Sequence, residues 1–429
     1  MAKPGLLALV GTAAAALSLV APAAVASTSA RYGIQDGAYL SAGPQLEARL
    51  ATLDELGAKL VRYMVNWRQI APRKPLHAAN PGDPAYDWRS TDRVLGALHA
   101  HRIDVLATLY RTPAWASRAR RPRDVPASRS SLAAFAVALA RRYPWVRRWE
   151  IWNEPNLNAF LIPVSPRLYV QRLLNPTYVA LHALNPANRV AGGATSPRGT
   201  STGLSPVAFM RGMRAARPRL DVYSHHPYPI TRGESPFGFA RGVCRFCRGV
   251  LTLANLPRLV REVKRDFGPK RIWLTEYGYQ TNPPDPFGVS LRLQAEYLAE
   301  AALRVETSPL VDMLVQFMVQ DEPQLNGWQS GLITAGGVAK PSFNSFRLPI
   351  VAARRRGRWT TIWGQVRPGS GAAHYQLQRR DTDRWRAVGP LALTNARGSY
   401  TRIVRAAKGT RFRIVWLPAN VTSRAIVIH

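Results

Sequence analysis

Two hydrophobic periodicities alternate along most of the chain. Short runs rich in β-branched and aromatic residues end in polar residues, Gly or Pro, and longer stretches with apolar residues at helical spacing follow them. Strands are predicted over residues 31–38, 58–67, 103–110, 147–154, 189–195, 220–228, 271–278 and 310–320. Helices are predicted over residues 43–57, 90–101, 128–143, 165–184, 203–216, 253–268 and 290–305, with a short one after Pro341.

The number and order of these units indicate the fold. Strand–helix units that repeat eight times between residues 31 and 348 predict an α/β fold of the (β/α)8 barrel class. A doubly wound sheet is the competing architecture, but it would favour a Gly-rich phosphate-binding turn after the first strand. Asp36-Gly37 does not provide such a turn, so the barrel is the better prediction.

The pattern changes near residue 350. Short strands separated by turn residues follow, and Arg alternates in them with Trp, Val and Ile, which is typical of half-buried strands. We predict a small all-β sandwich domain over residues 352–429. Attachment, stabilisation and carbohydrate binding all stay open as its role, beside a purely structural one.

The first residues have the features of an export signal. Lys3 provides the positive start, residues 6–20 are a short apolar run, and Ala24-Val25-Ala26 is a small-residue cleavage site. No later stretch is apolar enough for a membrane span. We therefore predict a signal peptide over residues 1–26 and a secreted, extracellular monomer without a membrane span.

The chain carries a formal net charge of +34, from 59 Lys and Arg against 25 Asp and Glu. A nucleic-acid-binding protein would be one explanation. The arginines are spread along the sequence rather than gathered in one block with aromatic residues, so composition alone is the simpler explanation and no nucleic-acid partner is expected. Attraction to an anionic polymer or cell surface stays open.

The two cysteines, Cys244 and Cys247, lie in the segment GVCRFCRG. In an exported protein a short disulfide that pins a loop is the expected state. A redox centre would need a strand-to-helix start that is not visible here, and a zinc site would need two further ligands nearby. We expect neither a metal site nor a cofactor.

Polar residues gather where the predicted strands end, on the face of such a barrel that carries active sites. The fourth strand ends in Asn153-Glu154, the seventh ends in Glu276, and the second carries Arg62. Two facing carboxylates in a cleft rich in Trp and Tyr suit cleavage of a glycosidic bond. One protonated acid gives its proton to the leaving oxygen, and one ionised carboxylate attacks the anomeric carbon. A nearby arginine would favour the ionised form.

These motifs resemble a known group of enzymes. WEIWNEPN (149–156) and IWLTEYGY (272–279) are similar to the strand-four and strand-seven signatures of the clan A glycoside hydrolases, and HPY on strand six fits the same pattern. RTPAWAS (111–117) is similar to family 39, and family 5 cellulase-like enzymes are the other relatives. The resemblance covers roughly residues 31–348. It implies a polysaccharide- or oligosaccharide-degrading hydrolase that retains anomeric configuration and needs no cofactor.

The resemblance also assigns roles. It makes Glu154 the general acid/base and Glu276 the nucleophile, with Arg62 orienting Glu276 and Asn153 bonding the sugar 2-hydroxyl. Further candidates for substrate binding are His226, Tyr228, Tyr277, Gln316, Trp67, Trp115 and Trp328.

Two departures from the pattern put the sugar in doubt. Family 5 enzymes usually have a histidine after strand three, where this chain has TLYRTPAW, and Gln316 stands where many relatives have Trp. Trp328, from the following loop, would then replace that aromatic surface. A transglycosylase and a non-catalytic carbohydrate- or polyanion-binding protein on a barrel scaffold stay open as alternatives, and so does an anionic carbohydrate as the substrate.

Overall fold

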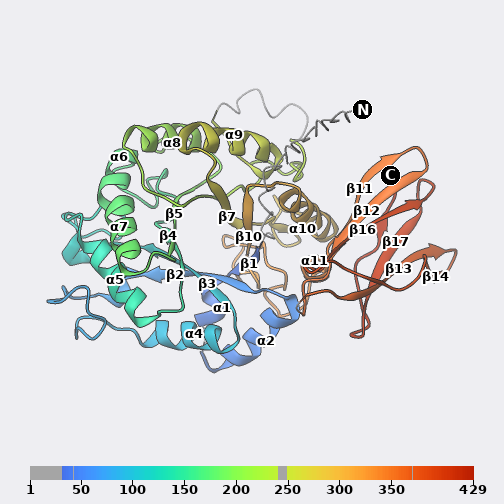
Figure 1. Ribbon diagram of the computed structural model, residues 1–429, viewed down its shortest axis with the longest axis horizontal. Coiled ribbons are helices and arrows are strands. Elements are labelled where there is room, and N and C mark those ends of the chain that lie inside the picture. The colour runs from blue at the N-terminus through green and yellow to red at the C-terminus, as the bar shows by residue number, and fades with distance from the viewer. Residues whose placement is uncertain (1–30, 42, 240–248, 370) are drawn as a thin grey trace, which may run out of the picture.

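A closed barrel of eight parallel strands forms the larger part of the protein (Figure 1). This computed structural model describes residues 31–429 apart from 42, 240–248 and 370. The barrel strands are β1 (Arg31–Gln35), β2 (Leu60–Asn66), β3 (Asp104–Tyr110), β4 (Arg148–Ile151), β5 (Arg189–Thr195), β6 (Val222–His225), β7 (Arg271–Tyr277) and β10 (Val311–Phe317). Neighbouring strands pair in this order and β10 pairs with β1, so all eight predicted strands and the barrel are confirmed.

Helices pack around the outside of the barrel (Figure 1). They are α1 (Gly37–Ser41), α2 (Leu46–Leu56), α3 (Trp67–Ile70), α4 (Arg89–Ala100), α5 (Ser131–Arg142), α6 (Pro166–Leu168), α7 (Asn175–Leu184), α8 (Pro206–Ala215), α9 (Leu256–Phe267), α10 (Leu291–Glu306) and α11 (Pro341–Arg347). One predicted helix, 165–184, is α6 and α7 joined by a π-helical turn, Tyr169–Leu174. Pro176 lacks the N–H that a regular helix would use there.

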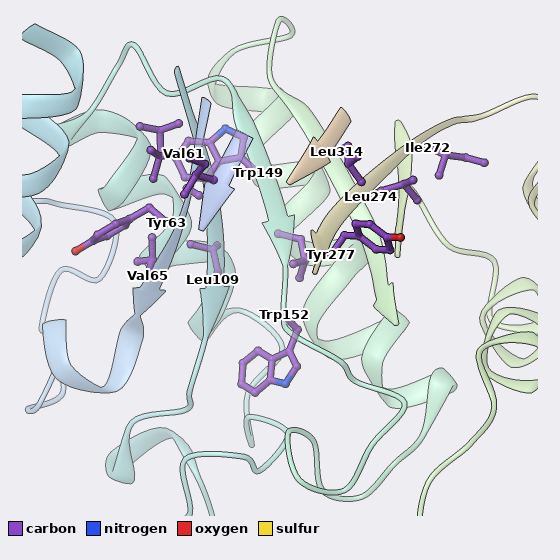
Figure 2. Close-up of a cluster of buried hydrophobic side chains, with 14 of the residues drawn as sticks. Val61, Tyr63, Val65, Leu109, Trp149, Trp152, Ile272, Leu274, Tyr277 and Leu314 are labelled. Carbon is purple, nitrogen blue, oxygen red and sulfur yellow. The ribbon is translucent and has the colours of Figure 1, made fainter. Parts of the chain in front are cut away.

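Alternation along the strands separates the inside of the barrel from the helix layer. Val61, Tyr63 and Val65 of β2 belong to the large apolar cluster that includes the helices (Figure 2), whereas Leu60 belongs to a separate small cluster of strand residues. Successive strand residues point to opposite faces, so Arg62 shares the inner face with Leu60. An arginine on the inner face of a barrel needs partners of opposite charge there.

The C-terminal part is a separate pair of antiparallel sheets, as predicted. One sheet consists of β11 (Ile350–Arg356), β12 (Trp359–Gln365) and β16 (Ser399–Arg405). The other consists of β13 (His374–Asp381), β14 (Arg384–Ala387), β17 (Arg411–Leu417) and three short strands, β15 (Ala392–Leu393), β18 (Val421–Thr422) and β19 (Ile426–Val427). A core of its own lies between them, to which Ile350, Ile362 and Phe412 contribute.

The two parts share a packed junction beside α10 and α11 (Figure 1). Val351 and Trp363, on the other face of the first sheet, belong to the apolar cluster of the barrel. The buried guanidinium of Arg367 lies 3.7 Å from the ring centroid of Tyr32 and 4.7 Å from that of Phe346. Cation–π contact thus joins the C-terminal domain to the start of β1.

Two sequence predictions fall outside the described residues. The signal peptide over residues 1–26 and the disulfide between Cys244 and Cys247 both lie there, so they stay predictions. Within the described part of the chain, no helix combines the length and the apolar character needed to cross a bilayer.

Replacing Gly57 by Ala should destabilise the junction. Gly57 ends α2 with φ 69°, and a Cβ there would lie 2.4 Å from the carbonyl carbon of Arg367. The left-handed backbone alone costs about 1–2 kcal/mol for a residue with a Cβ, and the overlap adds to that cost. We expect a lower midpoint of thermal unfolding. Gly96→Ala is the control, since Gly96 lies within α4 with no atom near its Cβ position; it should raise the midpoint slightly, and equal shifts for both variants would contradict the packing argument.

Candidate active site

A cavity of about 1060 Å³ opens at the carboxyl ends of the barrel strands. Its lining includes Gln35 at the end of β1, Asn153 and Glu154 after β4, Glu276 on β7 and Phe317 at the end of β10. Strand ends converge here because all eight strands run in parallel. The cavity therefore brings together residues that are up to 293 positions apart in the sequence, from Gln35 to Trp328.

Glu154 reaches the cavity because the backbone leaves the extended conformation. β4 ends at Ile151, earlier than predicted, and Trp152 and Glu154 have φ angles of 76° and 39°. Such left-handed angles are uncommon outside glycine and cluster at functional sites. The Glu154 amide donates to the carbonyl of Ala194 on β5. In a regular strand Asn153 and Glu154 would point to opposite sides, whereas here both line the cavity.

Glu276 reaches the cavity through an extra residue in β7. Leu314 and Gln316 of β10 are two positions apart, but their partners Leu274 and Tyr277 are three apart. This is a β-bulge, which changes the direction of the side chains that follow it. Leu274 and Tyr277 both belong to the apolar cluster (Figure 2), and the two residues between them are left to face inward. Without the bulge, Glu276 would share the face of Leu274.

The two carboxylates lie close together. One oxygen of Glu154, one oxygen of Glu276 and a ring nitrogen of His226 all lie within 4.8 Å of one another. The His226 Nδ1 is 3.0 Å from Glu154 Oε1 and 3.5 Å from Glu276 Oε2, and the Tyr228 hydroxyl donates to Glu276 Oε2 at 3.2 Å. Glycosidases that invert keep their carboxyl groups about 6.5–9.5 Å apart, and those that retain about 5–5.5 Å. The nearest oxygens of the two glutamates, at most 4.8 Å apart, lie closer to the retaining range than to the inverting one.

A buried ion cluster lies beneath Glu276. The fully buried guanidinium of Arg62 contacts Glu276 and the amide oxygen of Gln35, and its Nε donates to Glu150 Oε2 at 2.7 Å. Its Nη2 donates to the Asn153 amide oxygen at 2.9 Å. One cation thus holds groups from β1, β2, β4 and β7 in place.

The charges in this cluster follow from burial and from Arg62. Burial is the largest influence on the pKa of Glu150 and pushes it upward, but Arg62, the Thr108 hydroxyl and other neighbours together hold that pKa below its usual value. Burial raises the pKa of Glu276 above its usual value; Arg62 opposes the rise and Glu150 adds to it. Burial also lowers the pKa of His226, which keeps the imidazole neutral at neutral pH. The Nδ1–Oε1 contact orients the Glu154 carboxyl group whichever of the two holds the proton.

Three groups of this site could in principle ligate a cation, namely Glu154, His226 and Glu276. The charge beside them argues against it, because the Arg62 guanidinium already contacts Glu276 and would repel a metal ion. The His226 nitrogen that faces the carboxylates is also occupied by Glu154. The donor set therefore fits proton transfer better than metal binding.

Comparisons with known proteins agree with this geometry. The solved structure of a family 39 β-xylosidase from Caulobacter crescentus covers 82% of this chain and 82% of its own, with 20% identity and a TM-score of 0.53. A family 39 glycoside hydrolase from Bacteroides cellulosilyticus covers 89% of this chain and 80% of its own, with 16% identity and a TM-score of 0.58. This chain is similar to family 39 glycoside hydrolases. The resemblance predicted from the sequence is thereby confirmed.

A curated relative points the same way. A β-xylosidase from Caldicellulosiruptor saccharolyticus is 23% identical over 214 residues, which are 47% of this chain and 41% of that protein. The match thus spans about two fifths of the relative's length. No family model matches the chain. The family 39 resemblance therefore rests on fold and on this partial sequence match.

The structure separates the predicted sugar-binding residues into two groups. Tyr228 and Trp328 line the cavity, where their rings stack with centroids 5.7 Å apart. Trp328 is 41% exposed and meets Phe317 edge-on, so these residues form an aromatic surface beside Glu276. This surface arises from the loop after β10, where the sequence predicted that Trp328 would replace the strand-eight aromatic residue.

The other aromatic candidates lie elsewhere. Trp67 is fully buried against Trp115 and Phe135, with ring centroids 5.7 Å apart in both pairs, and Trp115 donates to the Ala71 carbonyl. Neither lines the cavity, because both pack in the layer between barrel and helices. Tyr277 turns outward beyond the bulge and donates to the Tyr279 hydroxyl. The structure therefore corrects the prediction that Trp67, Trp115 and Tyr277 contact sugar, because these side chains pack in the core.

Gln316 and the two histidines lie below the lining. The Gln316 amide donates to the Ser330 carbonyl at 2.8 Å, and its side chain is buried outside the lining. His226 supports Glu154 from below, rather than forming part of the cavity wall. His225 has both ring nitrogens engaged, by Thr195 and by the Leu251 carbonyl, so it acts in the core.

Two residues of the cluster escaped prediction. Glu150 is the inward-facing partner of Arg62, and Gln35 contacts the same guanidinium. A signal was present for Glu150, because an acid within the apolar strand WEIW requires a buried partner. Gln35 ends the first predicted strand without any such signal.

Replacing Arg62 by Met should strongly destabilise the protein. It would leave Glu150 buried without its cation, a change that typically costs about 3–5 kcal/mol. Chemical denaturation would measure the loss, with Arg261→Met on the exposed face of α9 as the control that stays within about 0.5 kcal/mol. Adding Glu150→Met to Arg62→Met should recover part of the loss. Equal stability of the Arg62 and Arg261 variants would show that the buried cation is not needed.

Proposed function

We propose that this protein is a retaining β-glycoside hydrolase that works by double displacement. The observation that carries the proposal is the pair of carboxylates, one just after β4 and one on β7, whose nearest oxygens are at most 4.8 Å apart at the mouth of the barrel. This distance fits attack by one carboxylate and proton transfer by the other across a single bond. The similarity to family 39 enzymes supports the same chemistry.

The contacts assign a role to each group. In the first step Glu276 attacks the anomeric carbon, the glycosidic bond breaks, and Glu154 gives its proton to the leaving oxygen. In the second step Glu154 takes a proton from water, which attacks the anomeric carbon and releases Glu276. Arg62 and Tyr228 hold the Glu276 carboxylate through donated hydrogen bonds. Asn153 lines the cavity with its oxygen engaged by Arg62, which directs its NH2 group toward a sugar hydroxyl.

The first substrate to test is an aryl β-xyloside. The curated relative and one solved relative are β-xylosidases, and the aromatic surface formed by Trp328 and Tyr228 suits stacking on a pyranose ring. Export through residues 1–26 remains part of the proposal, as does action on an extracellular carbohydrate. None of the described residues of the C-terminal domain lines the cavity, so we assign this domain no part in bond cleavage.

A 2-fluoro aryl β-glycoside should label Glu276. The fluorine slows hydrolysis of the covalent intermediate, so the mass of one glycosyl group should appear on the peptide containing Glu276. Glu276→Gln is the matched control and should stay unlabelled.

Glu154→Gln should lower turnover of substrates with poor leaving groups by about 10²–10⁴-fold while it keeps binding them. Label on another residue would refute the assignment, and an unchanged Glu154→Gln protein would indicate a non-catalytic binder.

Glu150→Gln should shift the acid limb of the pH profile of kcat/KM to lower pH. Glu276 must be ionised to attack, and its pKa is raised by burial and by the charge of Glu150. Activity is therefore lost as pH falls through that raised pKa, and removing the Glu150 charge lowers it. Glu47→Gln, on the exposed surface of α2, is the control and should leave the limb in place. A shift to higher pH would contradict the proposed coupling.

A further inference from the structure

Four arginines line the cavity in addition to the groups used above, namely Arg111, Arg123, Arg198 and Arg232. All four are exposed, and they come from the loops that follow β3, β5 and β6. Apart from Glu154 and Glu276, the acidic part of the lining is limited to Asp285, whose side chain is buried and accepts the Phe287 amide. The wall of the cavity therefore carries a clear excess of positive charge.

No carboxylate in the described part of the chain forms an ion pair with any of these four arginines. Residues 1–30, 42, 240–248 and 370 contain no Asp or Glu, so they cannot supply one. Arg123 donates to the Asn158 carbonyl, and Arg111 lies over the Tyr110 ring at 5.3 Å. By contrast, Arg121 in the same loop is paired with Asp124 at 2.9 Å. This loop therefore pairs Arg121, which lies outside the lining, with an acid, but gives Arg111 and Arg123 no such partner.

The arginines lie on one side of the reaction centre. Around the barrel the strand order β3-β4-β5-β6 puts all three loops on the arc that surrounds Glu154. The opposite arc, from β7 through β10 and β1 to β2, contributes no arginine or lysine to the lining; its charged side chains there are Glu276 and Asp285, beside uncharged ones such as Gln35, Phe317 and Trp328. Glu154 protonates the leaving oxygen, so the charged arc faces the leaving group and the aromatic arc faces the sugar under attack.

We propose that the leaving-group half of the cleft binds a negatively charged sugar unit, bearing either a uronate carboxylate or a sulfate ester. The choice of half rests on the proposed function, because it depends on Glu154 being the proton donor. A guanidinium presents paired N–H donors that match the two oxygens of a carboxylate or sulfate. Four such groups around one concave surface also concentrate the field where solvent is partly excluded, unlike charges spread over a convex surface.

The net charge of +34 could attract any polyanion, so the test must separate the cleft from the rest of the surface. All proteins in the test carry Glu154→Gln, so that ligands are bound and not consumed. The cleft variant adds Arg111→Gln, Arg123→Gln, Arg198→Gln and Arg232→Gln. The control variant adds Arg102→Gln, Arg147→Gln, Arg211→Gln and Arg261→Gln, which are exposed, lie outside the lining and remove the same charge.

Isothermal titration calorimetry with three tetrasaccharides gives the readout: neutral xylotetraose, tetragalacturonate, and a sulfated galactan tetrasaccharide without uronate. At least one anionic ligand should bind the parent protein about tenfold or more tightly than xylotetraose, a preference of about 1.4 kcal/mol. The control variant should keep that preference and the cleft variant should lose it. The anionic ligand that binds more tightly shows whether the cleft recognises a carboxylate group or a sulfate group.

Two results would overturn the proposal. One is equal affinity of the parent protein for all three ligands, or no binding of any. The other is an equal loss of preference in both quadruple variants, which would assign it to overall charge. Thermal unfolding of each variant checks that it is folded. Because binding is measured without turnover, an anion preference confined to the cleft would stand even if aryl glycosides were not hydrolysed, so failure of the proposed function would be seen separately.

Discussion

One buried guanidinium organises the reaction centre. Arg62 is enclosed within the barrel, where an isolated charge would be very costly, and it is stabilised there by Glu150 and Glu276. Glu150 lies wholly inside and serves as the permanent counter-ion. Glu276 is 11% exposed at its side chain and is the carboxylate that the cavity can reach. The same cation therefore supports the fold on one side and positions a carboxylate oxygen of the cavity on the other.

This arrangement explains why the two carboxylates near Arg62 differ. Burial acts on both, but Glu150 receives the Nε and Nη2 contacts of Arg62 together with the Thr108 hydroxyl. Glu276 shares Arg62 with Glu150 and so gains less from it, which leaves its pKa raised. Glu154 lies apart from the guanidinium and takes its orientation from His226. Different neighbours thus shift the pKa values of Glu150 and Glu276 in opposite directions.

Sequence patterns were sufficient for the barrel and for the placement of two glutamates in one cavity at the strand ends. Alternating strands and helices identified all eight units, and the chemistry of Asn153-Glu154 and Glu276 at strand ends suggested the reaction. Patterns failed where a side chain's direction depends on its neighbours. Trp67 and Trp115 were predicted to touch sugar, but Trp67 stacks on Phe135 and Trp115 meets Trp67 edge-on, since periodicity cannot tell a buried aromatic residue from one in a cleft. The ion pair between Arg62 and Glu150 joins residues 88 positions apart, so the acid in WEIW indicates that a buried partner is needed but not which residue it is.

The extra residue in β7 has a consequence for how this chain can change over time. Between Leu274 and Tyr277 the strand is one position longer than its neighbour, and this surplus lets two consecutive residues, Thr275 and Glu276, face inward. Substitutions elsewhere in the strand alter packing by degrees. Loss of a single codon there would keep nearly the same composition and apolar content, yet plain alternation would leave one inward position between Leu274 and Tyr277 where there are now two. Substitutions in this segment can therefore be tolerated more easily than a change in its length.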